Sequence, residues 1–343
     1  MTVLVTGAAG FIGMHVSKRL LDRAEAVVGM DNLNDYYDVS LKQSRLAILR
    51  NDPGFSFEHV DIVDMSALVA VMSKYRISRV IHLAAQAGVR YSITNPLSYG
   101  SANLVGYLNI LEACRQHQVE HLVYASSSSV YGNNHKLPFS ESDNVDHPVS
   151  LYAATKKANE LMAHSYSHLY GLPTSGLRLF TVYGPWGRPD MSPIIFTRAI
   201  FEGRPIELFN DGQMQRDFTY VDDVVEGIIR ILNSPPSAQR DADGVSRQDD
   251  VGTAAPWRVL NIGNRSPVKL MEYVSLIERL VGKSAIINLR PMQAGDMIAT
   301  YADTSLLRKT TGFEPETSLE SGLERLVEWV SYYYHYQRGN IRY

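Results

Sequence analysis

The stretch Val3-Leu-Val-Thr-Gly7-Ala-Ala-Gly10-Phe-Ile-Gly13 decides how the first half of this chain folds. Its apolar start predicts a short buried strand, and its three glycines predict a tight turn into a helix. Glycines in such a turn let the backbone approach a phosphate, and the following helix N-terminus supplies free N–H groups and a positive dipole end. A glycine turn that touches no ligand is the alternative. We therefore predict a dinucleotide pyrophosphate site formed by Gly7, Gly10, Phe11, Ile12 and Gly13.

Short apolar runs and amphipathic stretches alternate from this turn as far as about residue 180. After the first strand, the pattern predicts strands at 26–30, 56–60, 79–83, 121–125 and 174–180, and helices at 13–23, 66–74, 102–117 and 152–170. Strands that are continuously apolar and separated by helices are typical of a parallel sheet covered on both faces. The predicted fold class is α/β, with a doubly wound, Rossmann-type parallel sheet.

The alternation weakens beyond residue 180, and turn residues become denser at 184–187 and 210–212. We predict a dinucleotide-binding domain at 1–180 and a smaller, mixed α/β substrate-binding region at 181–343. Residues 235–256 are polar and poor in apolar side chains, which predicts a surface insertion and is compatible with disorder.

Composition excludes several other classes of protein. The chain has 343 residues, 45% of them hydrophobic, with 33 Lys+Arg against 36 Asp+Glu, a net charge of −3 and one cysteine. This argues against a disulfide framework, a Cys-rich metal site or nucleic acid as the main partner, and we predict no metal site. The N-terminus has no leader pattern and no run is long and apolar enough to span a membrane, so we expect a cytoplasmic protein without a membrane partner.

Acidic residues end the second and third predicted strands. An acid at Asp31 suits the ribose hydroxyls of NAD and would repel the 2′-phosphate of NADP, so NAD is the predicted cofactor. Asp61 and Ile62 stand where they would flank an adenine ring, although a loop or helix-capping aspartate is nearly as good a reading on sequence alone.

Tyr152 and Lys156 are spaced to share one helix face. A nearby ammonium stabilises a phenolate and lowers the tyrosine pKa toward the working range of a general base. Alone, such a pair is common by chance. The run Ser126-Ser-Ser-Ser129 follows the fifth predicted strand, where a hydroxyl would reach the same ligand, although a serine run alone is usually a polar turn.

Together, the glycine turn, Asp31, His82-Leu-Ala-Ala85, the serines before Val130-Tyr-Gly, and the Tyr152/Lys156 pair resemble the extended short-chain dehydrogenases/reductases. The resemblance covers nearly the whole chain. It implies that Tyr152 is the acid/base, that Lys156 lowers its pKa and holds the nicotinamide ribose, and that Ser127 is the catalytic hydroxyl, with Ser126 or Ser128 left open. It also implies a homodimer formed through the helices at 102–117 and 152–170. Cofactor-lining residues implied by the resemblance are Leu83, Ala84, Ala85 and Gln86.

Later segments resemble the nucleotide-sugar members of this family, which implies a UDP-sugar partner. In the segment Arg216-Asp-Phe-Thr-Tyr-Val-Asp-Asp223, Arg216 would bind the diphosphate, and Arg290 and Asp296 would close over the nucleotide. A surface Arg–Asp pair is the alternative for Arg216. Segments 31–38, 88–92 and 184–191 resemble the UDP-glucuronate 4-epimerases.

A hexuronate carries a carboxylate that needs a cation. The resemblance implies Arg188 for that role, with Thr181 and Ser128 beside the sugar and Arg90 and Ser92 as assistants; a loop arginine that binds a carbonyl is the alternative. The expected reaction is C4 epimerisation of UDP-glucuronate through a transient 4-keto sugar. A UDP-glucuronate decarboxylase, a 4-epimerase of another UDP-hexose and a non-enzymatic NAD(H) sensor are the competing readings.

Overall fold

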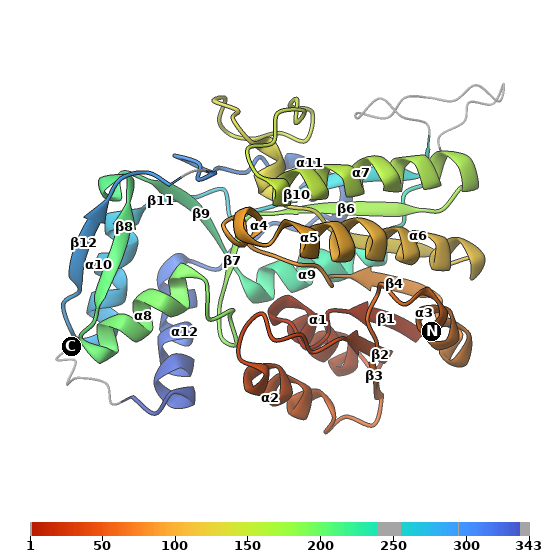
Figure 1. Ribbon diagram of the computed structural model, residues 1–343, viewed down its shortest axis with the longest axis horizontal. Helices are drawn as coiled ribbons and strands as arrows, with labels where there is room; N and C mark the ends of the chain where they lie inside the picture. The colour runs from red at the N-terminus through yellow and green to blue at the C-terminus, as the bar shows by residue number, and fades with distance from the viewer. Residues whose placement is uncertain (1, 239–254, 294, 337–343) are drawn as a thin grey trace.

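The computed structural model describes residues 2–238, 255–293 and 295–336, in a larger and a smaller lobe (Figure 1). The larger lobe is built on a seven-stranded sheet with the order β10-β6-β5-β4-β1-β2-β3, in which every neighbouring pair is parallel. Its strands are β1 (Thr2–Thr6), β2 (Ala26–Asp31), β3 (Phe55–His59), β4 (Arg79–His82), β5 (His121–Ala125), β6 (Thr174–Leu179) and β10 (Trp257–Ile262). The predicted doubly wound parallel sheet is therefore confirmed.

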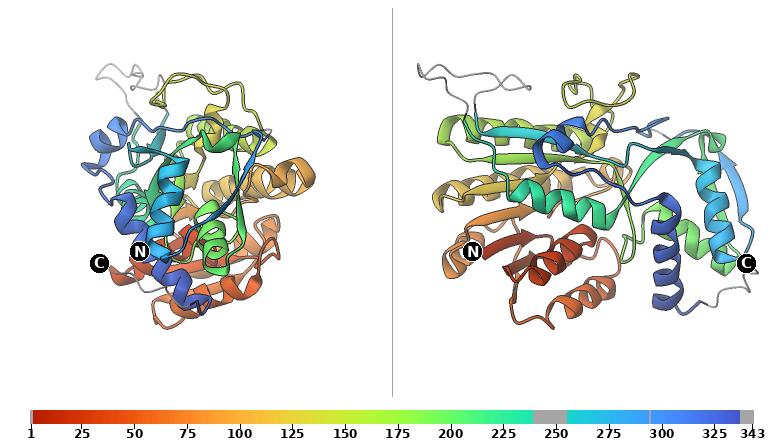
Figure 2. Two further views of the ribbon diagram at one scale, coloured as in Figure 1. Left: turned by 90° about the vertical axis from the view of Figure 1, so that its left-hand side faces the viewer. Right: turned by 180° about the vertical axis from the view of Figure 1, so that it is seen from behind.

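Both faces of this sheet are buried, because alternate side chains of each strand point to opposite faces. In β1, Val3 and Val5 belong to one hydrophobic core and Leu4 to the other. The first core is closed by helices α1 (Phe11–Asp22), α2 (Val39–Leu49) and α9 (Val221–Leu232), and the second by α3 (Met65–Tyr75), α6 (Tyr107–Gln116) and α7 (Leu151–Tyr170) (Figure 2). The two layers of helices hold the carboxyl ends of the strands in one fixed row.

The smaller lobe carries two short sheets. One has the order β11-β9-β7 and the other pairs β12 with β8. Its strands are β7 (Thr181–Tyr183), β8 (Pro205–Phe209), β9 (Gln215–Tyr220), β11 (Pro267–Lys269) and β12 (Ile286–Arg290), and its helices are α8 (Ser192–Glu202), α10 (Leu270–Val281) and α12 (Leu319–Tyr333). Short elements complete the chain at α4 (Tyr91–Thr94), α5 (Pro96–Tyr99), η1 (Gly100–Gly106), η2 (Ser128–Tyr131), η3 (Asn210–Gly212) and α11 (Ser305–Thr311). The predicted mixed α/β region is confirmed.

The division at residue 180 stays a prediction, and the structure adds a finding to it. Strand β10 and helix α9 come from beyond residue 180, yet β10 pairs with β6 and α9 packs on α1 in the larger lobe. Of the predicted insertion at 235–256, residues 239–254 lie outside the described part of the chain. No helix among the described residues has the length and apolarity needed to cross a membrane.

Candidate active site

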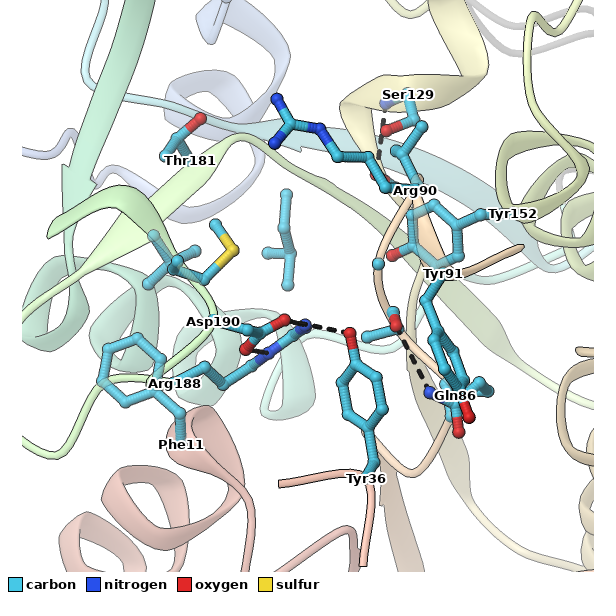
Figure 3. Close-up of a pocket in the computed structure, with 18 of the residues that line it drawn as sticks. Phe11, Tyr36, Gln86, Arg90, Tyr91, Ser129, Tyr152, Thr181, Arg188 and Asp190 are labelled. Carbon is cyan, nitrogen blue, oxygen red and sulfur yellow. Dashed lines mark hydrogen bonds and ion pairs between the residues drawn. The ribbon is translucent and has the colours of Figure 1, made fainter. Parts of the chain in front are cut away.

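A cavity of about 1110 Å³ lies where the carboxyl ends of β1, β2, β4 and β5 face the smaller lobe. Ligands of doubly wound sheets bind at this edge, because the loops that follow parallel strands all open there. Side chains from both lobes line it, including Asp31, Tyr152, Arg188 and Arg216 (Figure 3 shows part of the lining). The lining of this cavity contains most of the predicted site residues.

The glycine turn passes close to the backbone that follows β4, and its last glycine lies close to its first. Gly7 has φ +72°, and a Cβ on it would lie 2.8 Å from the backbone nitrogen of Ala84. A Cβ on Gly13 would lie 2.1 Å from the carbonyl oxygen of Gly7. Helix α1 begins after Gly10 with no side-chain cap, so its first N–H groups are available to an anion. The turn, with Phe11 and Ile12, lines the cavity as a pyrophosphate site requires.

Asp31 is buried at the end of β2, and its two carboxylate oxygens accept hydrogen bonds from backbone N–H groups. The Ala9 nitrogen lies 3.2 Å from Oδ2, and the Leu33 nitrogen lies 2.8 Å from Oδ1. Burial raises the pKa of Asp31, while the nearby Lys42 ammonium and these two hydrogen bonds lower it. Asp31 therefore ties the glycine turn to β2 while it faces the cavity.

The other predicted cofactor residues also line the cavity. Asp61 accepts hydrogen bonds from Asn32 Nδ2 at 2.9 Å and from the Val63 nitrogen at 3.0 Å, and Ile62 is buried. Leu83, Ala84, Ala85 and Gln86 follow β4 along the same wall. The backbone of Gln86 is held on both sides by Asn103 of the π-helix η1, at 2.8 and 3.0 Å. The structure thus brings every predicted cofactor residue to one cavity.

Tyr152 lies in the first turn of α7, whose N-terminus is capped by Ser150. Burial raises the pKa of Tyr152 above 10, while a hydrogen bond with Ser127 and the charge of Arg188 lower it. Lys156 donates instead to the carbonyl oxygen of Ala125 at 2.8 Å, and its Nζ lies 6.0 Å from the centre of the Tyr152 ring. Burial lowers the pKa of Lys156 to about 8. The effect of Lys156 on the tyrosine pKa stays a prediction; in this structure burial is the largest influence on the pKa of Tyr152, and the charge of Arg188 lowers it.

The serine run separates into different environments. Ser126 donates to Glu160 Oε1 at 2.6 Å, and Glu160 forms a buried ion pair with Arg178. Ser127 lies beside Tyr152, where its hydroxyl lowers the pKa of the tyrosine, and its Oγ accepts from the Ser129 nitrogen at 3.1 Å. Ser128 also lines the cavity. Of the open alternatives, Ser127 is therefore the hydroxyl that the structure places against Tyr152.

Arg188 does not stand alone in the cavity. Its Nε and Nη2 donate to the two carboxylate oxygens of Asp190, at 3.0 and 2.5 Å, and the Tyr36 hydroxyl donates to Asp190 at 3.0 Å (Figure 3). The guanidinium lies 5.7 Å from the centre of the Tyr36 ring. The cation predicted to meet a uronate carboxylate thus already has an anionic partner. Thr181, at the start of β7, lines the same cavity.

Arg216 faces the cavity from β9, and its neighbour Asp217 points the other way, as alternation along a strand requires. Asp217 is buried and accepts three backbone N–H hydrogen bonds, so the pair is not the surface Arg–Asp contact considered from sequence. Burial lowers the pKa of Arg216, and Asp296 raises it. Arg90 pairs with Asp296 at 3.1 Å and lies 4.5 Å from the centre of the Phe209 ring.

Two predicted substrate residues lie outside the lining of the cavity. Ser92 is buried and donates to the carbonyl oxygen of Val89 at 2.6 Å, because it turns inward in the short helix α4. Arg290 ends β12 and pairs with Glu207 at 2.9 Å, with half of its side chain exposed. The structure therefore does not bring these two side chains into the cavity lining, and their roles toward a substrate stay predictions.

Several lining residues were missed from sequence, and Tyr36, Lys42, Asp190 and Phe209 are among them. Tyr36 and Asp190 lie inside the segments 31–38 and 184–191 that carried the resemblance, so their motifs were recognised but not their contact. Lys42 donates to the backbone and side-chain oxygens of Asn34, and no motif identified it. Phe209 precedes the Asn210-Asp-Gly turn, which was the available signal for a residue at a strand end.

Comparisons with known proteins identify the family of the chain. A family model described as the NAD dependent epimerase/dehydratase family matches residues 3–243. The chain is 50% identical over 334 residues to a probable UDP-glucuronate 4-epimerase from Rhizobium meliloti (strain 1021), covering 97% of this chain and 98% of that protein. It is 48% identical to UDP-glucuronate 4-epimerase 2 of Arabidopsis thaliana, over 97% of this chain and 76% of that protein. The solved structure of UDP-glucuronic acid 4-epimerase from Bacillus cereus in complex with UDP-glucuronic acid and NAD is similar with a TM-score of 0.86, at 32% identity, covering 97% of this chain and all of that one.

Proposed function

Because the chain belongs to the NAD dependent epimerase/dehydratase family, we propose that it inverts carbon 4 of UDP-glucuronate to give UDP-galacturonate, with NAD as cofactor. One observation carries the proposal: Tyr152, Ser127 and Arg188 line the same cavity, and Arg188 lies close enough to Tyr152 for its charge to lower the pKa of the tyrosine. One sugar ring could thus place its carboxylate at Arg188 and its 4-hydroxyl at Tyr152.

The described residues fit NAD. The cradle at Gly7 and Gly13 would be filled by any Cβ, and Asp31 ends β2 as a ribose-binding acid should. When bound, NAD supplies a carbon that accepts a hydride and gives it back. We propose that the glycine turn holds the pyrophosphate and that Asp31 binds the adenosine ribose. Asp61 and Ile62 would flank the adenine, and Leu83–Gln86 would form the wall beside the cofactor.

We propose that Tyr152 is the base that takes the proton from the sugar 4-hydroxyl at its phenolic oxygen and later returns it. Since burial raises its pKa, the phenolate needs the stabilising hydrogen bond from Ser127 and nearby positive charge. Lys156, held by Ala125 below the tyrosine ring, is positioned to bind the nicotinamide ribose and to add to that positive charge.

The carboxylate decides between epimerisation and decarboxylation. A 4-keto uronate is a β-keto acid: if its C5–C6 bond aligns with the carbonyl π system, that bond breaks, CO2 leaves, and the electron pair forms an enolate that takes a proton from water at C5. Arg188, with Thr181 and Ser128 on the other side of the sugar, would hold the carboxylate away from that alignment. Arg216 would bind the diphosphate. Arg90 was predicted to assist Arg188 at the carboxylate, but it lies near Arg216 and pairs with Asp296, so we propose that it assists Arg216 instead. Phe209 would offer a ring face to the base.

The deciding experiment is incubation with UDP-glucuronate and no added reductant, followed by proton NMR. UDP-galacturonate with all six sugar carbons supports the proposal. A pentose with CO2 release would identify a decarboxylase, and interconversion of UDP-glucose alone would identify another 4-epimerase. Bound NAD with no turnover of any of these would support the sensor. Tyr152→Phe should lower kcat by about 10²-fold or more without loss of NAD, with Tyr170→Phe on the exposed end of α7 as the matched control.

We further propose a homodimer formed through an apolar face of the larger lobe. Helices α5, α6 and α7 lie together there with η1 (Figure 1). They expose Leu97 (85%), Val105 (50%), Leu108 (44%) and Leu161 (56%), an arrangement that favours burial against a second copy. Light scattering should give the mass of two chains, and Leu161→Glu should shift it to one. A one-chain mass for the unaltered protein at working concentration would contradict this.

The cytoplasmic location stays a prediction.

A further inference from the structure

Three consecutive carbonyl oxygens of the loop that leads into Arg188 are held by side chains from the larger lobe. His15 Nε2, on α1, lies 2.9 Å from the Pro185 oxygen. Arg45, on α2, donates from Nε and Nη2 to the Trp186 oxygen at 3.1 and 2.6 Å, and from Nη2 to the Gly187 oxygen at 3.2 Å. Arg188 is the next residue, so its backbone is anchored immediately before its side chain enters the cavity.

Arg45 also reaches the glycine turn. Its Nη1 donates to the carbonyl oxygen of Ala9 at 3.0 Å and to the hydroxyl of Tyr37 at 2.7 Å. The side chain is fully buried, and all five of its N–H donors have an acceptor. No carboxylate of the described residues forms an ion pair with it. A buried guanidinium bonded to neutral oxygens is unusual, because burying a charge without an opposite charge is unfavourable. Here it joins two backbone segments.

The loop itself has a conformation that needs support. Trp186 has φ +62°, a left-handed backbone that a large side chain rarely adopts. Its ring packs 5.3 Å from the ring centres of both Trp329 and Tyr333, on α12. Burial lowers the pKa of His15, so the imidazole is neutral near pH 7, and because a carbonyl accepts only, the proton is on Nε2. Contacts from α1, α2 and α12 thus converge on the same three residues.

We propose that Arg45 and His15 are positioning residues that lock the Arg188 loop onto the glycine turn, so that recognition of the sugar carboxylate depends on the backbone that binds the cofactor pyrophosphate. The inference rests on the proposed function, since it assigns these residues to the carboxylate end of UDP-glucuronate. Neither residue lines the cavity, so both act through Arg188. Loosening the loop displaces a guanidinium whose contact with a carboxylate depends on alignment to within about 1 Å.

The test uses the NAD-loaded enzyme and two ligands, UDP-glucuronate as substrate and UDP as inhibitor. Arg45→Met should raise the KM for UDP-glucuronate about tenfold or more, and leave the inhibition constant of UDP within about twofold, because UDP lacks the carboxylate. Arg258→Met is the matched control. Arg258 also donates to neutral oxygens, those of Ser175 and Ser234, and lies outside the cavity lining. Its loss should leave the ratio of the two constants unchanged.

His15 gives a second, milder pair of variants in case Arg45→Met does not fold. His15→Gln keeps an N–H donor and should keep the wild-type ratio, whereas His15→Leu removes the donor and should raise the KM for UDP-glucuronate alone. The inference is overturned if Arg45→Met or His15→Leu weakens UDP and UDP-glucuronate equally. If the unaltered enzyme does not distinguish UDP-glucuronate from UDP-glucose, the proposed function fails instead, and the two failures are separate.

Discussion

Arg188 and Asp190 form a two-pronged ion pair inside the cavity, with donor–acceptor distances of 3.0 and 2.5 Å. The pair places an anion beside the cation assigned to the sugar carboxylate, and the Tyr36 hydroxyl donates to Asp190 Oδ2, the same oxygen that accepts from Arg188 Nη2. Asp190 therefore sets how much positive charge a substrate carboxylate meets on entering.

Replacing Asp190 by Asn should strengthen UDP-glucuronate binding, because it removes the repulsion between two carboxylates that share one guanidinium. Both side chains of the pair are partly exposed, so we expect a modest fall in KM, about threefold. Binding of UDP should not change. Steady-state kinetics with both ligands checks this, with Asp22→Asn on the outer face of α1 as control. A higher KM for UDP-glucuronate would show that Asp190 chiefly orients Arg188.

Ser127 and Ser126 should respond differently to loss of their hydroxyls. Ser127→Ala removes the hydrogen bond to Tyr152 that lowers the tyrosine pKa, so kcat should fall about 10-fold to 10²-fold at neutral pH and recover partly at higher pH. Ser126→Ala removes a bond to Glu160, which keeps its ion pair with Arg178, so stability should fall more than kcat. Kinetics and denaturant unfolding on both variants check this, and equal losses of kcat would refute the assignment.

Gly13→Ala should abolish NAD retention or folding, because the new Cβ would lie 2.1 Å from the Gly7 oxygen. Gly100→Ala offers a matched control, since nothing lies within 4 Å of its Cβ position. Bound cofactor can be measured by absorbance after denaturing the purified proteins. A Gly13→Ala protein that carries as much NAD as Gly100→Ala would contradict the close approach seen at the turn.

The buried carboxyl group of Glu141 should make the free energy of unfolding depend on pH. It is buried, accepts from the Asn261 nitrogen at 2.8 Å, and burial raises its pKa from 4.5 to about 7. The folded state therefore holds the Glu141 proton more tightly than the unfolded state does. The contribution of this proton to the free energy of unfolding is complete below about pH 4.5 and is lost as pH rises through about 7. At about 1.4 kcal/mol per pKa unit, the loss is on the order of 3 kcal/mol.

Unfolding with urea at about pH 5 and about pH 8 measures this contribution, since stability rises or falls with pH according to proton uptake. Glu141→Gln keeps the acceptor for Asn261 without the proton, so the free energy of unfolding should fall less between the two values than in the unaltered protein. Glu324→Gln, at an exposed position on α12, should behave as the unaltered protein does. If the free energy of unfolding fell equally in all three proteins, Glu141 would not be the cause of the pH dependence.

Much of the fold could be predicted because its signals are local. Most strands of the first half, such as β1 and β2, are apolar runs between turn residues, and Gly7-x-x-Gly10-x-x-Gly13 marks where strand becomes helix. Tyr152 and Lys156 share a helix face by spacing alone. Where the resemblance supplied whole segments, as at 31–38 and 184–191, the cavity does contain residues of both.

The features that escaped prediction depend on contacts between distant segments. Nothing near Arg45 shows that its three carbonyl acceptors are 36, 141 and 142 residues away. The sequence also does not show that Ser92 donates to the Val89 carbonyl or that Arg290 pairs with Glu207, because the direction of a side chain depends on the tertiary packing of α4 and β12. The spacing of Tyr152 and Lys156 likewise carries no information on their burial or on the Ala125 carbonyl that accepts from the Lys156 ammonium.

The pairing of β10 with β6 has a consequence for the order in which the chain matures. These strands are neighbours in register from Trp257 on Thr174 to Ile262 on Leu179, with the whole of α8, β8, β9 and α9 between them in sequence. During synthesis, β6 therefore leaves the ribosome as an open sheet edge, with N–H and C=O groups ready to pair with another chain. The edge of β6 stays unpaired until residues 257–262 emerge. Because β10 is distant in sequence from β6, their pairing is a slow step of sheet assembly during which the open edge is exposed to aggregation.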